Sequence, residues 1–93
     1  MRKNDKKIDN KLRQLLTEVC DFALHNSPGY KWITHSVNYN RFPESLVITC
    51  TFEDKLSADN AEQEKVLLTL IQQKLNSASI KLLTPSKQVN FTC

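Results

Sequence analysis

The residues of this sequence best suited to chemistry are one histidine and the cysteines near it. His35 lies between Ile33 and Val37 in an alternating stretch, so one side of the imidazole is expected to face apolar neighbours. Nucleophilic Cys-His chemistry would need Cys50 or Cys20 within hydrogen-bond reach of His35, and a third group to orient the ring. The sequence supplies no such third group. We therefore expect a partly buried structural histidine and no catalytic residue.

The cysteines argue against a metal centre and against a disulfide scaffold. Cys20, Cys50 and Cys93 are odd in number and widely spaced, and the chain contains no Cys-x-x-Cys pair. Each falls on or beside an apolar stripe, where a cysteine acts as a small core residue. We expect no metal ligand and no cofactor-binding residue. Free thiols favour a reducing compartment, here the cytoplasm.

Motifs of the common enzyme classes are missing. The chain has a single glycine, so it has no Gly-rich phosphate loop, and it contains neither a Gly-x-Ser-x-Gly elbow nor a His-Glu-x-x-His pair. We therefore expect a protein that is not an enzyme. A thiol-dependent or small-molecule function at His35 and Cys50 is the least favoured hypothesis.

A row of uncharged polar side chains is the most informative surface feature. If the apolar residues of the expected strands face the helices, the residues that point the other way are Trp32, Thr34, Ser36, Asn38, Val47, Thr49, Thr51, Gln88, Asn90 and Thr92. Sheets that read RNA stack bases on two or three aromatic side chains among Lys and Arg, whereas this face has one aromatic and no basic stripe. An uncharged face with one exposed tryptophan fits a partner protein or a second copy of the chain. An unpaired edge strand of the sheet is the other expected route to such association. The alternative is an ordinary solvated sheet face.

Positive charge is concentrated at the N-terminus. Residues 1–13 hold six basic and two acidic residues, a net charge of +4, whereas the remaining residues sum to −1. The candidate nucleic-acid contacts are Arg2, Lys3, Lys6, Lys7, Lys31 and Arg41. Lys or Arg bound to phosphates would release counterions and make binding salt-dependent. Acidic residues are interleaved along the same helix, which is typical of a solvated face, so nucleic-acid association is the second hypothesis.

The first element is expected to be an amphipathic helix that follows a disordered segment over residues 1–5. Apolar residues recur at steps of three and four at Ile8, Leu12, Leu15, Leu16, Val19, Phe22 and Ala23. Asp5 is a candidate N-cap. The helix should end near His25 and Asn26, because Pro28 disfavours helical geometry at the residue before it.

The later elements are expected to be a hairpin, a second helix and two short strands. The hairpin arms are predicted over 31–39 and 46–53, with a broad loop around Pro43. The second helix is predicted from a cap at Ser57 or Asp59 to about Asn76. Strands are predicted over 80–83 and 88–93, joined by a turn at Pro85.

These elements predict one α+β domain over residues 1–93. The expected architecture is a two-layer αββαββ sandwich, with two helices on one face of a four-stranded, mostly antiparallel sheet. If the second helix makes a right-handed split crossover, the last strand fits between the third and the second, a permuted ferredoxin-like order. A simple meander is the alternative. No apolar run is long enough to span a bilayer, so we expect a soluble protein.

Four segments resemble a family of small uncharacterised bacterial proteins. They are Lys31 to His35, Val37 to Tyr39, Phe42 to Leu46, and Leu70 to Gln73. Members of this family are sometimes labelled Fis-type transcriptional regulators, a label that implies a helical dimer ending in a basic helix-turn-helix. The C-terminal third of this sequence departs from that pattern, because it predicts strands and residues 56–93 are not markedly basic. The resemblance assigns no residue a role.

Overall fold

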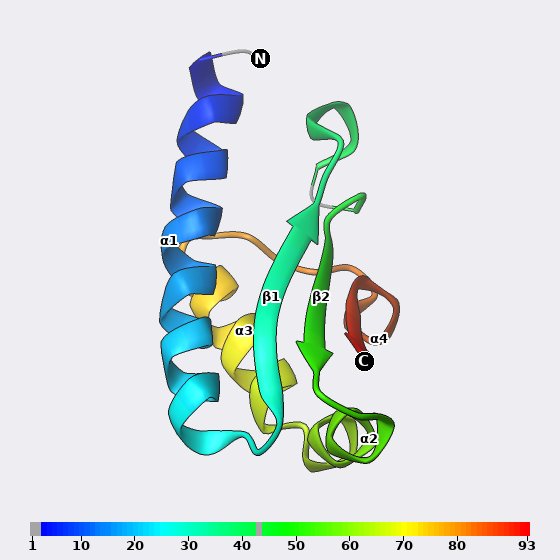
Figure 1. The fold of residues 1–93 in the computed structure, drawn as a ribbon. Helices are drawn as coiled ribbons and strands as arrows, with labels where there is room; N and C mark the ends of the chain where they lie inside the picture. Colours follow the sequence, from blue (N-terminus) through cyan, green and yellow to red (C-terminus); the bar gives the residue numbers. More distant parts are fainter. Residues whose placement is uncertain (1–2, 43) are drawn as a thin grey trace.

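The computed structural model describes residues 3–42 and 44–93, with side chains from residue 5 onward. Within these ranges the chain has an α+β fold with four α-helices, one 3-10 turn and a three-stranded mixed sheet (Figure 1). The elements are α1 (Lys3–Asn26), β1 (Tyr30–Ser36), η1 (Tyr39–Arg41), β2 (Val47–Phe52), α2 (Lys55–Glu64), α3 (Val66–Ser77), α4 (Pro85–Gln88) and β3 (Val89–Thr92). The predicted α+β class is confirmed.

The sheet has three strands in the described residues, and the predicted four-stranded sheet is wrong. Their order is β1-β2-β3, with β1 antiparallel to β2 and β2 parallel to β3. Residues 80–83, predicted as a strand, belong to none. Ile80 and Leu82 are buried and alternate with exposed Lys81 and Leu83. The alternation in the sequence therefore reflects two side chains that pack in the core, and not a strand.

The last strand lies beside β2 as predicted, but its direction differs. The chain leaves β2, passes through α2, α3 and the segment at 80–84, and returns in the same direction as β2. A parallel neighbour follows because this crossover contains helices and no intervening strand. Pro85 begins the short helix α4 and does not form a turn between two strands.

The helices cover one face of the sheet. In Figure 1, α3 lies behind the strands and α1 runs alongside β1, while no helix lies in front of β1 and β2. The core residues on β2 are Ile48, Cys50 and Phe52, each at most 1% exposed. They pack with buried Leu12 and Val19 of α1 and with the apolar side of α3. Fully burying side chains of this size contributes about 1.5–3 kcal/mol each.

Helix α1 begins earlier than predicted and ends where predicted. It starts at Lys3, so residues 3–5 are helical, and Asp5 lies in the first turn instead of forming the cap. Residues 1 and 2 lie outside the described part. Phe22, predicted on the buried stripe, is 37% exposed. After Asn26 the chain turns through Gly29, whose φ of 79° is a conformation that favours glycine.

The predicted second helix is divided in two at Lys65. Lys65 has a left-handed conformation with φ 58°, and Asp54, not Ser57 or Asp59, caps α2 by accepting a hydrogen bond from the Ser57 N–H. The buried residues of α2 are Ala58 and Ala61, and those of α3 are Leu67, Ile71 and Leu75. In one continuous helix the two sets would differ in direction by roughly a third of a turn. The break lets both face the core.

A bulge in β1 separates an inward from an outward aromatic residue. The register shifts between Tyr30, opposite Phe52, and Trp32, opposite Thr51. Tyr30 therefore packs in the core, with its ring centroid 5.8 Å from that of Phe52, and Trp32 points outward. Sequence alternation alone did not reveal this extra residue.

Gln88, predicted on the outer sheet face, is instead 3% exposed and joins the crossover to β2. Its amide nitrogen donates to the Leu46 carbonyl at 2.9 Å and to the Glu44 carbonyl at 3.3 Å, and its amide oxygen accepts from the Thr84 N–H at 2.8 Å. These bonds connect the start of β3 with the start of β2. Gln88 therefore aligns the two parallel strands.

We predict that Gln88→Leu lowers the free energy of unfolding by about 2 kcal/mol, because it leaves buried backbone groups without partners. The measurement is urea unfolding followed by circular dichroism. Lys87→Leu is the matched control, since Lys87 is exposed in the same helix. Equal stability of the two variants would show that the Gln88 bonds do not hold the crossover.

Candidate functional site

The register of the sheet assembles the predicted partner face into rows. Opposite residues on the outer side are Trp32 and Thr51, then Thr34 and Thr49, then Ser36 and Val47. The parallel pairing extends two of these rows to β3, placing Asn90 beside Thr49 and Thr92 beside Thr51. These rows carry hydroxyl, amide, valine and tryptophan side chains, and none of these described residues is charged.

Trp32 is the largest apolar side chain on this face and is 51% exposed. The Lys31 Nζ lies 5.9 Å from the Trp32 ring centroid, within range of a cation-π contact. Thr49 and Thr51 are half-buried in the central strand, whereas Thr34 and Ser36 are exposed on β1. The result is a polar surface with one large aromatic at its margin.

Asn38 is placed differently from the prediction. It lies beyond the end of β1, where its side chain accepts a hydrogen bond from the Asn40 N–H at 3.0 Å and caps η1. Its N–H donates to the Ser45 hydroxyl at 2.9 Å, and that hydroxyl donates to the Asn38 carbonyl at 2.7 Å. Asn38 closes the β1-β2 loop and is not part of the outer face. Pro43, predicted to shape this loop, lies outside the described residues.

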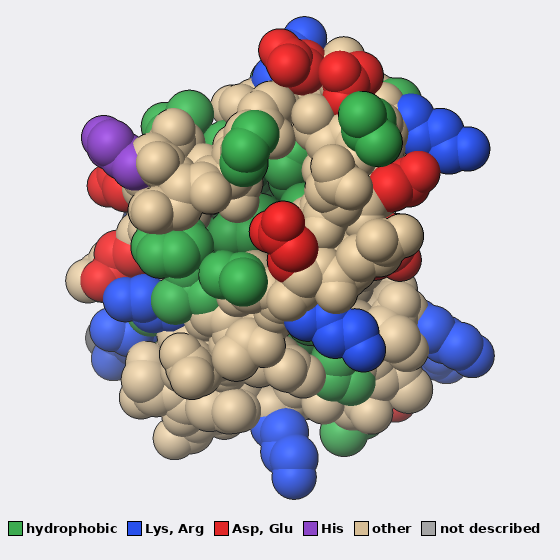
Figure 2. All heavy atoms as spheres, turned by 90° about the horizontal axis from the view of Figure 1, so that it is seen from below, with side chains coloured by type: hydrophobic (Ala, Val, Ile, Leu, Met, Phe, Trp, Pro, Cys, Tyr) green, Lys and Arg blue, Asp and Glu red, His purple; other side chains and the backbone are tan. Residues whose placement is uncertain are grey.

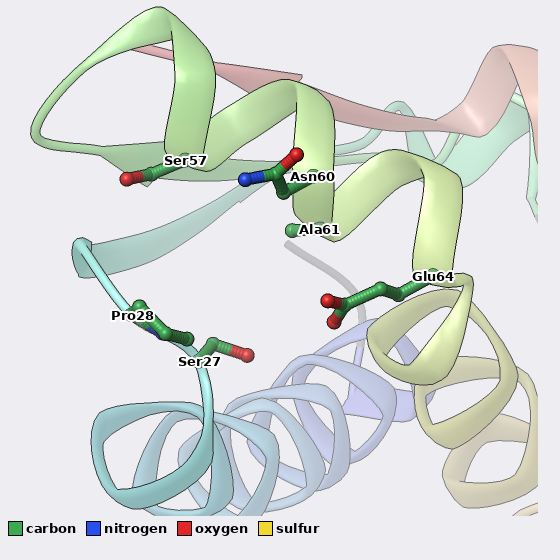
Figure 3. Close-up of a pocket in the computed structure, with 6 residues that line it drawn as sticks. All are labelled: Ser27, Pro28, Ser57, Asn60, Ala61 and Glu64. Carbon is green, nitrogen blue, oxygen red and sulfur yellow. The ribbon is translucent and has the colours of Figure 1, made fainter.

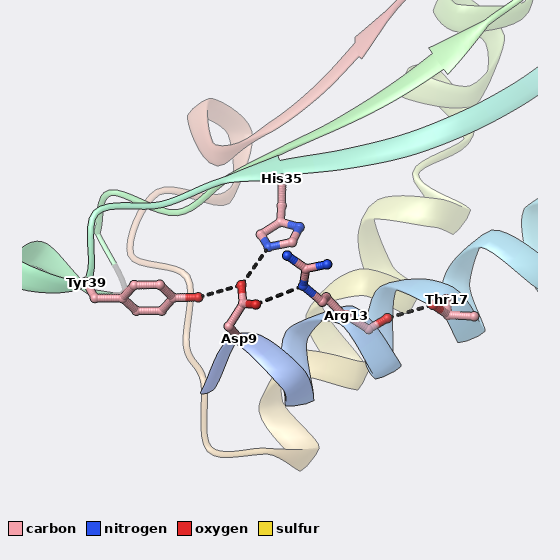
Figure 4. A network of polar contacts seen from close by, with 5 residues as sticks. All are labelled: Asp9, Arg13, Thr17, His35 and Tyr39. Carbon is pink, nitrogen blue, oxygen red and sulfur yellow. Dashed lines mark hydrogen bonds and ion pairs between the residues drawn. The ribbon is translucent and has the colours of Figure 1, made fainter. Parts of the chain in front are cut away.

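A polar cluster, which we call the Asp9 cluster, joins α1 to β1 and the following loop (Figure 4). Asp9 Oδ1 accepts from the Tyr39 hydroxyl at 2.9 Å and lies 3.5 Å from His35 Nε2, and Asp9 Oδ2 accepts from Arg13 Nε at 2.8 Å. The side chains of Asp9 and His35 are only 16% and 17% exposed. Asp9 thus supplies the orienting group for His35 that sequence reasoning did not find.

The Asp9 cluster shifts the pKa values of two of its members. The Tyr39 hydroxyl, followed by Arg13 and His35, lowers the pKa of Asp9 by stabilising the carboxylate, although partial burial opposes this. Partial burial and the bond to Asp9 raise the pKa of Tyr39 to about 12. At neutral pH the pair is therefore a phenol donating to a carboxylate.

The structure separates His35 from Cys20 and buries Cys50 in the core. Cys20 follows Asp9 by eleven residues on α1, which is roughly 16 Å along the helix. The tip of His35, held at Asp9, is thus distant from Cys20. Cys50 is fully buried, and burial, followed by the nearby Cys20, raises the pKa of its thiol to about 12. A thiol this weakly acidic is protonated at neutral pH and is a poor nucleophile.

Tyr30 brings a polar atom into the same part of the core. Its hydroxyl is buried without a hydrogen-bond partner in the described residues. Burial raises the pKa of Tyr30, and the nearby Cys20 thiol adds to the shift without standing in hydrogen-bond geometry. Cys93 is exposed at the other end of the chain.

The candidate nucleic-acid contacts lie at both ends of the molecule. Lys6 and Lys7 are exposed near the start of α1, and the Asp9 to Tyr39 bond holds η1, with exposed Arg41, at that same end. Lys31 lies at the opposite end of β1 and does not join them. Arg2 and the side chain of Lys3 are outside the described part.

Two of the concave areas in the described residues lie beside α2 and α3. The first is a cavity of only about 70 Å³ between the 27–29 turn and α2, lined by Ser27, Pro28, Ser57, Asn60, Ala61 and Glu64 (Figure 3). Ligand cavities for small organic molecules are usually several times larger. Within the ranges described, no group of three or more His, Cys, Asp or Glu side chains is placed to hold a metal ion.

The second concave area lies between the end of α1 and the start of α3. This groove of about 360 Å³ has Phe22 of α1 and Val66 and Leu70 of α3 as its apolar lining, and its polar lining is Glu64, Lys65, Thr69 and Gln73. Figure 2, which views the molecule from below, shows hydrophobic side chains gathered around a hollow on that face. Phe22 and Val66 are 37% and 49% exposed.

Comparison of the chain with protein-family models, curated proteins and solved structures gave no match. The described helices include none that is both long and apolar enough to cross a membrane.

We predict that Asp9→Asn and Tyr39→Phe each lower the free energy of unfolding by about 1 kcal/mol at neutral pH and that their effects are not additive. Because folding lowers the Asp9 pKa, its stabilisation is complete above the ordinary value of 3.8 and is lost as the pH falls through the lower folded value. Both variants should therefore approach the wild type in strong acid. Urea unfolding at neutral and acid pH measures this.

Asp21→Asn is the matched control for this cycle, because Asp21 is an exposed carboxylate on the same helix. Additive losses, or a difference between wild type and Asp9→Asn that persists in strong acid, would contradict the assigned Asp9 to Tyr39 coupling.

Proposed function

We propose that this chain is a non-enzymatic interaction module that binds a partner protein, or a second copy of itself, through the outer face of its sheet. The observation that carries the proposal is the half-exposed Trp32 at the margin of uncharged rows on a face that no described helix covers. Buried tryptophans are among the strongest anchors of protein interfaces, and interface centres are depleted of charge.

The shape of the face supports the same function. The threonine and serine side chains in register across β1 and β2 are short, so a partner can approach the strands closely. The Lys31 ammonium beside the indole ring can remain hydrated at the rim while the ring itself is covered. Trp32 would then be the anchor and the hydroxyls would supply hydrogen bonds.

We predict that Trp32→Thr weakens association at this face at least tenfold, because it removes the anchor while retaining a β-forming residue. Sedimentation of wild type and variant over a concentration series measures self-association. Trp32 is the single tryptophan of the chain, so its fluorescence reports specifically on this face. Leu56→Thr is the control, because Leu56 is 69% exposed on α2.

If the chain is monomeric, the same variants are compared for the complexes that they retain on purification from the source cells. A Trp32→Thr protein that keeps the oligomeric state and all partners of the wild type would refute the proposal. If the Leu56→Thr control also loses self-association or its partners, the effect is not specific to the sheet face.

Nucleic-acid association is the second candidate, favoured by the Asp9 to Tyr39 bond that places Arg41 at the same end of the molecule as Lys6 and Lys7. The regulator label given to proteins that this chain resembles would correspond to this function. The acidic residues of α1 and the net charge of −1 outside residues 1–13 weigh against it. It therefore ranks below a protein partner.

For this second function we predict that replacing Arg2, Lys3, Lys6 and Lys7 by Gln abolishes binding to a short DNA or RNA duplex at low salt. Each lost phosphate contact should reduce the slope of log affinity against log salt by about 0.9 for a DNA duplex. The control replaces Lys55, Lys74, Lys81 and Lys87 by Gln, which removes the same charge elsewhere. Equal effects of the two sets would indicate non-specific attraction only.

A further inference from the structure

Strand β1 leaves one side of its backbone free. It pairs with β2 on one side and lies at the edge of the sheet on the other, where the described residues provide no strand. With seven residues it is the longest strand, whereas β3 at the opposite edge has four. Unpaired N–H and C=O groups along an edge are a template for an added strand.

The features that protect a strand edge from pairing with another chain are confined to one end of β1. The bulge lies between Tyr30 and Trp32, and the charged Lys31 lies within it. Residues 33–36 contain no Lys, Arg, Asp, Glu or Pro. This half of the strand is regular and lacks the features that usually discourage pairing.

A groove follows this edge between β1 and α1. It has a volume of about 340 Å³ and is lined by Arg13, Leu16, Thr17 and Cys20 of the helix and by Ile33 and His35 of the strand. Residues four apart on a helix are separated by about 6 Å along its axis, and alternate residues of a strand by about 6.6 Å. The inward side chains of an added strand would therefore have nearly the same spacing as Arg13, Thr17 and the residue one turn further along α1.

The lining determines what the added strand should carry. Leu16, Cys20 and Ile33 offer apolar contacts at one end of the groove. At the other end, Arg13 uses only Nε to bind Asp9, and its two terminal nitrogens have no partner in the described residues. A guanidinium with two free nitrogens suits a carboxylate.

We propose that this edge binds an extended segment of another protein as an added strand, with alternate apolar side chains over Leu16 and Cys20 and an Asp or Glu at Arg13. Main-chain hydrogen bonds to β1 supply affinity and the groove supplies sequence preference. Helix α1 flanks this edge (Figure 1), so a second copy paired here would bring its own α1 against the first, whereas a single extended segment carries no such helix. The site is separate from the Trp32 face and does not depend on it.

The test is selection from a random peptide library displayed on phage, followed by titration of an enriched peptide into the 15N-labelled protein. We expect enriched sequences to alternate apolar and polar residues and to contain an acidic residue on the apolar side. Amide shifts and slowed hydrogen exchange should map to β1 and to the Arg13 to Cys20 side of α1.

Variants on α1 then separate this site from other surfaces. Thr17→Trp, which fills the groove from an exposed position, should weaken binding at least tenfold, and Arg13→Gln about tenfold. Their controls are Gln14→Trp, exposed on another side of α1, and Arg41→Gln on the loop. Each control should bind as the wild type does.

Three results would overturn the proposal: no enrichment over the Thr17→Trp protein, shifts located elsewhere, or equal binding by Thr17→Trp and Gln14→Trp. Shifts around Trp32 that are lost in Trp32→Thr would instead support the outer-face function alone. The two proposals can thus fail independently.

Discussion

The fold depends on the pairing of β2 on both sides. This strand is antiparallel to β1 and parallel to β3, and its inward residues Ile48, Cys50 and Phe52 form the centre of the core. The parallel neighbour requires the chain to travel from one end of the sheet to the other, and α2, α3 and the 80–84 segment provide that path. Gln88 completes it by bonding the end of the path to the start of β2. Helices α2, α3 and α4 belong to this crossover, and no described helix lies over the outer face of β1 and β2 (Figure 1).

Elements with a strong local pattern could be predicted from the sequence, and those set by tertiary contacts could not. The alternation from Leu46 to Phe52 and the periodicity of α1 each describe a single buried side, and both elements form close to where they were expected. The segment at 80–83 also alternates, but strand formation needs a neighbouring ladder, and β3 already occupies the place beside β2. Lysine is not a residue type that interrupts helices, so the sequence around Lys65 does not predict a break. The break follows from the different directions that Ala61 and Leu67 must face to reach the core.

The outer face was predictable for a similar reason. Side chains alternate across a strand, so the residues opposite the apolar set had to share a face, and the bulge at Lys31 changed only the position of Tyr30. The two misplaced members, Asn38 and Gln88, lie where a strand ends and short-range bonds decide the geometry. The Asp9 cluster could not be predicted from side-chain alternation. Asp9 and Tyr39 are thirty residues apart, and their contact depends on how α1 lies against β1.

The Asp9 cluster also determines what α1 can offer on its exposed side. Asp9 occupies one nitrogen of Arg13, binds the Tyr39 hydroxyl and faces His35, so it fixes the position of the first half of α1 against the end of β1. Further along, buried Leu12, Leu15, Leu16 and Val19 fix the helix by packing. The groove between helix and strand is held from both ends, one polar and one apolar. A groove fixed in this way needs little reorganisation to accept a strand, and that is the condition under which main-chain pairing at an edge can contribute net affinity.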